Sequence, residues 1–156
     1  MPSSMKKIAI PGLMGNVLEW YDFALYGYFA SILSPLFFPT DNKILSLITT
    51  FAVFAIGFIM RPLGAMIFGY FGDRFGRKNS LASAILLMAI PTTLIGALPT
   101  YSQIGITASL LLIFFRLLQG LAVGGEFTGS IVYIIEHAPA KQRGFYGSLA
   151  MSSAFN

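Results

Sequence analysis

A block of ten residues, GYFGDRFGRK at positions 69–78, separates two long apolar stretches of the chain. Each flank is long enough to cross the hydrocarbon core of a bilayer, which takes about 20 helical residues. The block itself carries two arginines, a lysine and an aspartate, and these charges would be very unfavourable inside lipid. The sequence therefore predicts a tight, charged hairpin at a membrane surface, between two membrane helices.

The composition supports a membrane protein. Hydrophobic residues make up 56% of the chain and charged residues only 10%, whereas soluble proteins average about 25% charged residues. A chain of 156 residues has too little interior to hide so much apolar surface from water, so its solvent should be lipid. The chain has no cysteine, which excludes disulfides and thiolate metal sites.

The apolar stretches predict an all-α membrane protein, a polytopic bundle of four transmembrane helices and the start of a fifth. The spans are expected at about residues 13–38, 44–71, 81–98 and 104–135. The third has no ionisable residue and should face lipid or lie at the periphery, and the fourth exceeds a core of about 30 Å, so it should tilt or protrude. The fifth begins near residue 144, and its dozen residues reach roughly 20 Å, too short to span.

The basic residues of the loops predict the orientation. An N-terminus inside the cell places only Lys43 outside, and it puts the other loop residues at the cytoplasmic face: Lys6, Lys7, Arg74, Arg77, Lys78, Lys141 and Arg143. We therefore expect a multi-pass protein of the cell (inner) membrane with a cytoplasmic N-terminus. A secretory signal peptide is excluded because Glu19 and Asp22 interrupt the first apolar region and no small-residue cleavage site follows it.

Several blocks of this sequence resemble a known family. The pattern G-x-x-x-D-R-x-G-R-K at positions 69–78 resembles the signature loop of the major facilitator superfamily, which lies on the cytoplasmic side between the second and third helices. Three more blocks, GNVLEWYDFALYG at 15–27, RPLG at 61–64 and QGLAVGGEFTG at 119–129, are similar to the metabolite:proton symporter family. Members of that family carry proline and glycine betaine, 2-oxoglutarate, shikimate or citrate.

The resemblance implies proton-coupled symport of a small organic solute, either an osmoprotectant such as proline or glycine betaine or an organic acid, by alternating access. It also implies twelve helices in two six-helix halves, so residues 1–156 would form part of the first half, as a fragment, a split gene or a truncated copy. We expect such a chain to insert alone but not to transport. Its expected partners are the solute, protons, membrane lipid and the remainder of the transporter. The alternatives are an efflux carrier of the same superfamily, or a non-transporting remnant or accessory subunit.

Charged residues inside the predicted spans are the candidate site. Each costs about 2.5 to 3.5 kcal/mol on insertion scales, so each needs a partner. Glu19, Asp22 and Tyr26 share one face of the first span, and Arg116 and Gln119 share one face of the fourth. Related proton-coupled sugar carriers place an acid of the first helix against an arginine of the fourth. That resemblance implies that Asp22 and Arg116 form the proton-coupling pair, with Glu19 as the alternative acid.

Two further charged residues belong to the same candidate cavity. Glu126 lies in the fourth span, and Arg61 lies in the second, directly before Pro62. Because a proline removes a backbone donor, Arg61 could instead satisfy carbonyl groups or a neighbouring acid. Tyr26 is either a packing residue or a contact for a cation such as betaine. For the whole set the alternative is that buried ion pairs only orient the helices.

Charged residues at the inner loops are a candidate gating latch. In the family pattern, Asp73 and Arg77 link the hairpin to neighbouring helix ends, and Glu136 with Arg143 matches the acidic and basic positions that follow the fourth helix. The proposed latch comprises Asp73, Arg74, Arg77, Lys78, Glu136 and Arg143. The simpler alternative is that the basic residues only set the topology.

Glycines of the fourth span have the spacing of close helix packing. Gly120 with Gly124, and Gly125 with Gly129, are small residues four positions apart, which lets two helix backbones approach closely in lipid. The same smooth surface suits helices that slide or rock during alternating access.

Enzyme functions are not expected. The run GGEF at 124–127 superficially resembles the turn of nucleotide-cyclising domains, but it lacks the second acidic residue and lies within a predicted span. His137 is the only histidine, so neither a histidine-rich metal site nor a Ser-His-Asp set can be assembled. No cofactor is expected, and no nucleic acid, because the basic residues are not interleaved with stacking aromatics.

Overall fold

The structure, a computed structural model, describes residues 3–153 and is helical almost throughout. Within these residues there are six α-helices, one short 3₁₀ helix and no strand: α1 Ser3–Phe37, α2 Lys43–Phe75, α3 Arg77–Gly96, α4 Tyr101–Ile104, α5 Ile106–His137, η1 Ala140–Gln142 and α6 Arg143–Ser153. The expected all-α fold is confirmed.

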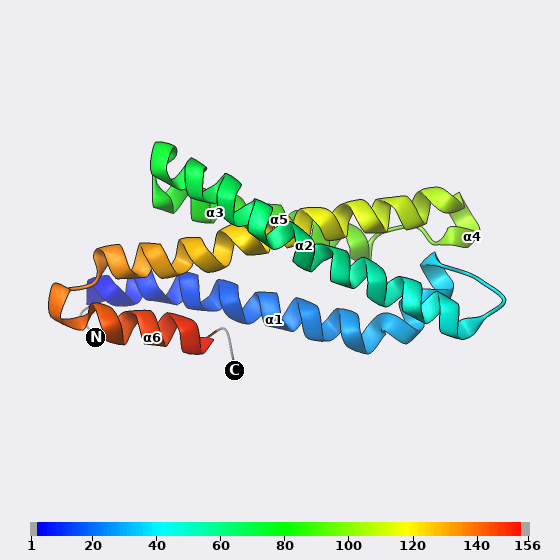
Figure 1. Cartoon of the computed structure of the whole chain (residues 1–156), viewed down its shortest axis with the longest axis horizontal. Coiled ribbons are helices and arrows are strands. Elements are labelled where there is room, and N and C mark those ends of the chain that lie inside the picture. Colours follow the sequence, from blue (N-terminus) through cyan, green and yellow to red (C-terminus); the bar gives the residue numbers. More distant parts are fainter. Residues whose placement is uncertain (1–2, 154–156) are drawn as a thin grey trace.

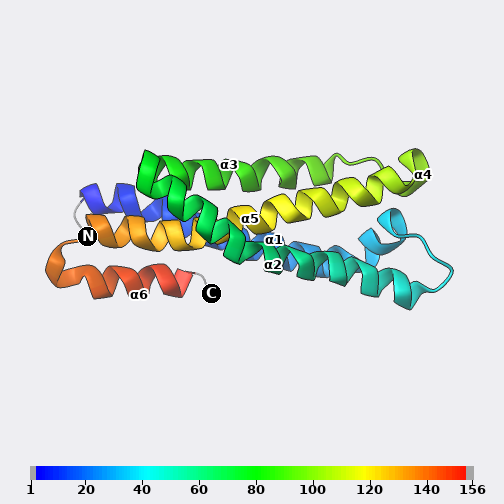
Figure 2. The same ribbon diagram turned by 45° about the horizontal axis from the view of Figure 1, so that its top comes forward.

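The long helices run roughly along one common axis (Figures 1 and 2). The beginning of α1, the turn between α2 and α3, and the turn between α5 and α6 lie at one end of the bundle. The loop between α1 and α2 and the short α4 lie at the other end. The seven basic loop residues that are expected at the cytoplasmic face therefore belong to segments at one end of the bundle. Lys43 begins α2 at the other end. The side chains of Lys6 and Lys7 lie outside the described part.

Three helices are long and apolar enough to cross a membrane by length and composition, namely α2, α3 and α5. They correspond to the second, third and fourth predicted spans. Helix α1 has 35 residues but is not among the three, because acids, tyrosines and other polar residues dilute its apolar part. A membrane crossing by α1 remains a prediction.

Two glycines and one asparagine set the helix boundaries. Gly76 has a φ of +93°, a conformation that residues with a Cβ rarely adopt, and it alone separates α2 from α3. Gly105, with a φ of +63°, separates the α4 turn from α5, so the stretch predicted as one span from 104 is divided at its start. The side chain of Asn42 caps α2 by accepting hydrogen bonds from the backbone N–H groups of Ile44 and Leu45.

Helices α2 and α5 cross with their backbones in contact. A Cβ atom added at Gly120 would lie 2.1 Å from the carbonyl oxygen of Gly57, and one added at Gly124 would lie 2.0 Å from that of Arg61. Gly125 is covered by the Phe68 ring, whereas an added Cβ at Gly129 would make only an ordinary contact. Close approach at small residues replaces the hydrophobic effect as the source of helix association in lipid.

Helices α3 and α6 complete the bundle from outside. Helix α3 packs on α2 and α5 through Ala84, Met88 and Pro91, and its position at the periphery facing lipid stays a prediction. Helix α6 packs on the end of α5, where Tyr146 and Ala150 form a small core with Ile134.

Candidate functional site

Asp22 and Arg116 meet in the middle of the bundle. The Nη1 atom of Arg116, in α5, donates a hydrogen bond of 2.9 Å to Oδ2 of Asp22, in α1. Arg116 is buried and Asp22 is largely buried. The structure therefore brings together the two residues that the family resemblance pairs, although 94 positions separate them in the sequence.

Two neighbours, Tyr26 and Gln119, contact this ion pair and are themselves held by other helices. The Arg116 guanidinium lies over the Tyr26 ring, 3.8 Å from its centroid, and the Tyr26 hydroxyl donates to the backbone carbonyl of Thr50 in α2. The Gln119 amide donates to Thr92 of α3 at 2.6 Å and approaches Asp22 at 3.5 Å. Four helices thus contribute to the surroundings of one carboxylate.

Glu19 and Arg61 form a second ion pair, between α1 and α2. The Nη2 atom of Arg61 lies 2.9 Å from Oε1 of Glu19, which is only 3% exposed. The guanidinium also lies against two phenylalanine rings, with its central carbon 4.7 Å from the centroid of Phe23 and 4.3 Å from that of Phe58. Of the two roles considered for Arg61, the structure has it contacting a neighbouring acid.

Glu126 joins neither pair. Its side chain is 1% exposed, and both carboxyl oxygens have no hydrogen-bond partner among the described residues. It faces the backbone of α1 at Gly15, where an added Cβ would lie 1.9 Å from Oε1 of Glu126. The absence of a side chain at Gly15 therefore makes the room that this carboxyl occupies.

The candidate latch is assembled around Arg77. This residue forms ion pairs with Asp73 one turn earlier and with Glu136 at the end of α5, where Nε and Oε1 are 3.4 Å apart. Arg74 instead donates to the Tyr70 hydroxyl. Glu136 and Arg143, which match the acidic and basic positions of the family pattern after the fourth helix, are not paired with each other: Arg143 is exposed and has no ion pair among the described side chains.

Lys78, another cation of the candidate latch, is exposed and has no ion pair within the described part of the chain. The hairpin is therefore linked to α5 through Arg77. The side chain of Arg77 points toward α5. Arg77 is the first residue of α3, and its side chain lies over Gly72, so that a Cβ atom added at Gly72 would lie 3.0 Å from the guanidinium.

A cavity of about 330 Å³ lies beside the Asp22–Arg116 pair, between α1, α3 and α5. Its wall is mostly apolar, and Asp22, Glu126, Thr92 and Thr93 are among the residues that line it. A neighbouring cavity of about 480 Å³ extends from Asp22, Tyr26 and Arg116 toward α4. Two of the three acids of the predicted site therefore line one space.

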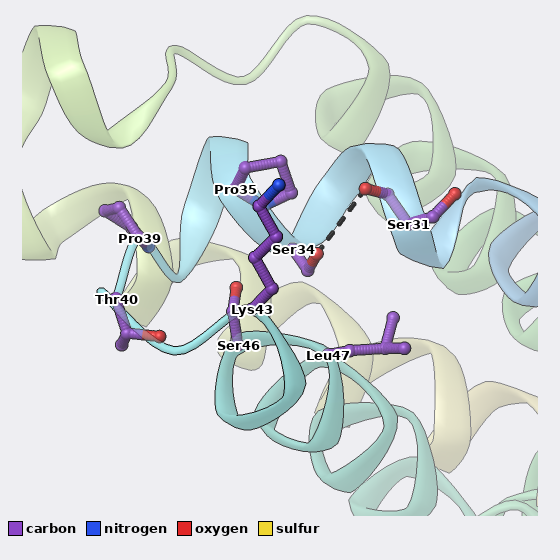
Figure 3. A pocket seen from close by; sticks show the side chains of 8 residues that line it. All are labelled: Ser31, Ser34, Pro35, Pro39, Thr40, Lys43, Ser46 and Leu47. Atoms are coloured by element: carbon purple, nitrogen blue, oxygen red, sulfur yellow. Dashed lines mark hydrogen bonds between the residues drawn. The ribbon is translucent and has the colours of Figure 1, made fainter.

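Another cavity lies at the outer end of the α1–α2 hairpin and contains none of the predicted site residues. Its volume is about 490 Å³. Figure 3 shows the Lys43 side chain extending across it toward Pro35, and the Ser34 hydroxyl bonded to the carbonyl of Ser31. The hydroxyls of Ser34 and Ser46 are already used in bonds to backbone carbonyls, so they serve the hairpin itself.

Sequence reasoning missed several residues that complete the site. Thr92 stands on the helix expected to be peripheral, and its only signal was a pair of threonines within an apolar run. Gly15 was noted as part of a family block but not as the contact of Glu126. Phe23 and Phe58 gave no signal, because an aromatic residue within an apolar span is most often a packing residue.

The two ion pairs within the spans join α1 to other helices, Glu19 to Arg61 of α2 and Asp22 to Arg116 of α5. Neutralising either acid would weaken its junction. In the described residues there is no cluster of three or more histidine, cysteine, aspartate or glutamate side chains that could hold a metal ion.

Comparison with known proteins identifies transporters as the relatives of this chain. The model of the sugar (and other) transporter family matches residues 8–154. The proline/betaine transporter of Salmonella typhimurium is 41% identical over 144 residues, which are 92% of this chain and 29% of that protein. A glycine betaine/proline/ectoine/pipecolic acid transporter of Dickeya dadantii is also 41% identical, with the same coverage. A putative proline/betaine transporter of Staphylococcus aureus is 44% identical over 92% of this chain and 31% of its own length.

These matches cover only part of each relative. The chain spans less than a third of the length of the curated proteins that it matches. No solved structure matches the chain significantly.

Proposed function

Because the chain belongs to the sugar (and other) transporter family, within the major facilitator superfamily, we propose that it contributes to proton-coupled symport of a small zwitterionic solute. The family consists of transporters and not of enzymes, and the chain is a multi-pass membrane protein. The names of the relatives support the solute class, since proline, betaine, ectoine and pipecolic acid all combine a carboxylate with a positively charged group.

The observation that carries the proposal is the ion pair of Asp22 with Arg116. With Asp22 ionised, its attraction to the guanidinium holds α1 against α5 in a medium of low dielectric constant. A proton bound to Asp22 removes this attraction and leaves Arg116 free to bind the carboxylate of a solute. Proton binding and solute binding would then favour each other, which is the requirement for symport.

The latch would add the conformational step. Ion pairs of Arg77 with Asp73 and Glu136 link the α2–α3 turn to the end of α5 at one end of the bundle. In our proposal this end faces the cytoplasm of a cell (inner) membrane, with the N-terminus inside, and the pairs break when the transporter opens inward. Alternating access would follow from rocking of this bundle against the rest of the carrier.

The test uses a chimera in which this chain replaces the matching segment of the Salmonella relative. Uptake of radiolabelled proline into proteoliposomes is measured with and without an imposed proton gradient. We expect Asp22→Asn to abolish uphill, proton-driven accumulation but to retain downhill movement or exchange, because the amide imitates a permanently protonated acid. The matched control is Asp41→Asn, which removes an exposed carboxylate from the loop between α1 and α2.

Unchanged proton-driven accumulation in Asp22→Asn would eliminate Asp22 as the coupling acid. The alternative acid is then tested by Glu19→Gln, which breaks the pair with Arg61 and leaves the Asp22–Arg116 pair intact. If neither variant affects uphill uptake, the proton-coupling proposal for this bundle is wrong.

A further inference from the structure

Within the described spans, acidic side chains outnumber basic ones. The described spans place three acids, Glu19, Asp22 and Glu126, away from the helix ends, but only two bases. Each base has its own acid, since Arg61 pairs with Glu19 and Arg116 pairs with Asp22. Glu126 is the acid that remains.

Among the described residues, no other group near Glu126 can neutralise a charge on it. On α1, Glu19 is close enough to repel such a charge, and Tyr21 and Asp22 line the same cavity as Glu126. On α2, the Arg61 guanidinium is held by Glu19, and α3 has no ionisable residue between Leu81 and its end. The surroundings of Glu126 therefore contain two further acids and no free base among the described residues.

The carboxyl group of Glu126 also lacks the hydrogen bonds that an ionised form needs. Its side chain is 1% exposed and neither oxygen has a partner in the described part of the chain. The Oε1 atom lies against the α1 backbone at Gly15. An isolated ionised carboxylate is extremely unfavourable in a medium of low dielectric constant, and a group in this position becomes neutral instead.

We propose that Glu126 is a second proton-binding site, whose carboxyl group carries a proton in this conformation while Asp22 is ionised against Arg116. The proton sits on one of its two carboxyl oxygens, of which Oε1 lies against α1 at Gly15. This inference rests on burial, charge and geometry, and it holds whether or not the Asp22–Arg116 pair couples transport.

The same cavity relates Glu126 to the first site. Asp22 and Glu126 both line the space of about 330 Å³ between α1, α3 and α5. Both carboxyl oxygens of Glu126 are enclosed in this conformation, so they are not in contact with water in that space. Transfer of the proton to Asp22 would leave Glu126 as a carboxylate and Asp22 as the neutral acid, so one proton is conserved. Because an ionised Glu126 is unfavourable in this conformation, that transfer would accompany a conformational change.

The experiment is infrared spectroscopy of the whole chain, residues 1–156, in lipid nanodiscs at pH 7. A protonated carboxyl group shows a C=O stretch that is separate from the bands of carboxylates and amides. We expect the wild-type spectrum to contain this band and Glu126→Gln to lose it. Glu136→Gln, which removes an exposed carboxylate from the end of the same helix, should keep it, and so should Glu19→Gln.

A second measurement does not depend on any substitution. The chain has three glutamates and three aspartates, so labelling only the glutamate carboxyls with carbon-13 should shift the protonated band. A band that is absent, that stays in Glu126→Gln, or that does not shift with this label would overturn the proposal. So would a Glu126 carboxylate band that changes on adding sodium ions, because a bound metal cation would then be the neutralising group.

These outcomes are independent of the coupling test. Loss of uphill uptake in Asp22→Asn, together with an ionised Glu126, would support the proposed function and refute the second proton site. A protonated Glu126 with unchanged uptake in Asp22→Asn would do the reverse.

Discussion

The Cα of Gly64, in α2, lies so close to Leu121, in α5, that a Cβ atom added at Gly64 would stand 1.9 Å from the carbonyl oxygen of Leu121. The obstacle is backbone, so no side-chain rotation could remove the clash. The two helices would have to separate along the crossing that also contains Gly120 and Gly124.

Gly64→Ala should therefore destabilise the bundle by about 1 to 3 kcal/mol, the usual effect of overpacking a filled interface. The matched control is Gly69→Ala, five positions later in the same helix, where an added Cβ would meet nothing within 4 Å. Alanine favours a helix over glycine by about 1 kcal/mol, so Gly69→Ala should be neutral or stabilising. Thermal unfolding in detergent, followed by circular dichroism, distinguishes the two. Equal melting temperatures would contradict the close crossing.

Breaking the pair between Asp22 and Arg116 should affect stability much more than breaking a pair at the rim. Asp22→Asn leaves a buried guanidinium without its counterion, a change that usually costs about 3 to 5 kcal/mol. Asp73→Asn removes an exposed partner of Arg77 and should cost about 0 to 1 kcal/mol. The measurement is thermal unfolding of both variants. The double variant Asp22→Leu with Arg116→Met should recover most of the loss, and no recovery would show that the pair is not the source of the effect.

Chain topology can be checked with single cysteines, since the natural sequence has none. The bias of basic residues predicts that a cysteine at Asp41→Cys is labelled by a membrane-impermeant maleimide on intact cells. A cysteine introduced by Lys141→Cys should be labelled only after permeabilisation, because η1 lies in the turn between α5 and α6, at the end of the bundle opposite the loop between α1 and α2 (Figure 1). The reversed pattern would overturn the proposed orientation.

The ion pairs of the latch predict different effects for two adjacent basic residues, Arg77 and Lys78. Arg77→Gln removes the ion pairs with Asp73 and Glu136, so the melting temperature should fall by an amount equivalent to about 1 kcal/mol or less. Lys78→Gln removes the same charge from an exposed position without an ion pair in the described residues, and it should leave the melting temperature unchanged. A similar shift in both variants would mean that net positive charge, and not pairing, matters at this turn.

The sequence alone predicts the elements of this fold well, because lipid imposes strong conditions on it. Long apolar runs and the charged block at 69–78 locate α2, α3 and α5 to within a few residues, since loops and clusters of charge are not tolerated in contact with lipid. The division at Gly105 was not predicted, because nothing in an apolar run indicates a positive φ at a single glycine.

Pairing across helices is predicted less well from the residues themselves. The match of Asp22 with Arg116 came from resemblance to a family, whereas periodicity gave only the faces on which they stand. Arg61 had carbonyl groups and an acid as alternatives, and the residues alone did not indicate that Glu136 pairs with Arg77. Which side chains meet depends on how far each helix is rotated and where it crosses its neighbours, and a single sequence does not specify either quantity.

Glu19 and Asp22 stand three residues apart on α1, yet their ion pairs lead to different helices, Glu19 to Arg61 in α2 and Asp22 to Arg116 in α5. A proton therefore does not simply loosen α1. When it binds Asp22, α1 is released from α5 but stays attached to α2, and when it binds Glu19 the reverse holds. The acid that binds the proton would thus decide whether α1 moves together with α2 or with α5. Protonation at a given acid would therefore favour one direction of helix movement.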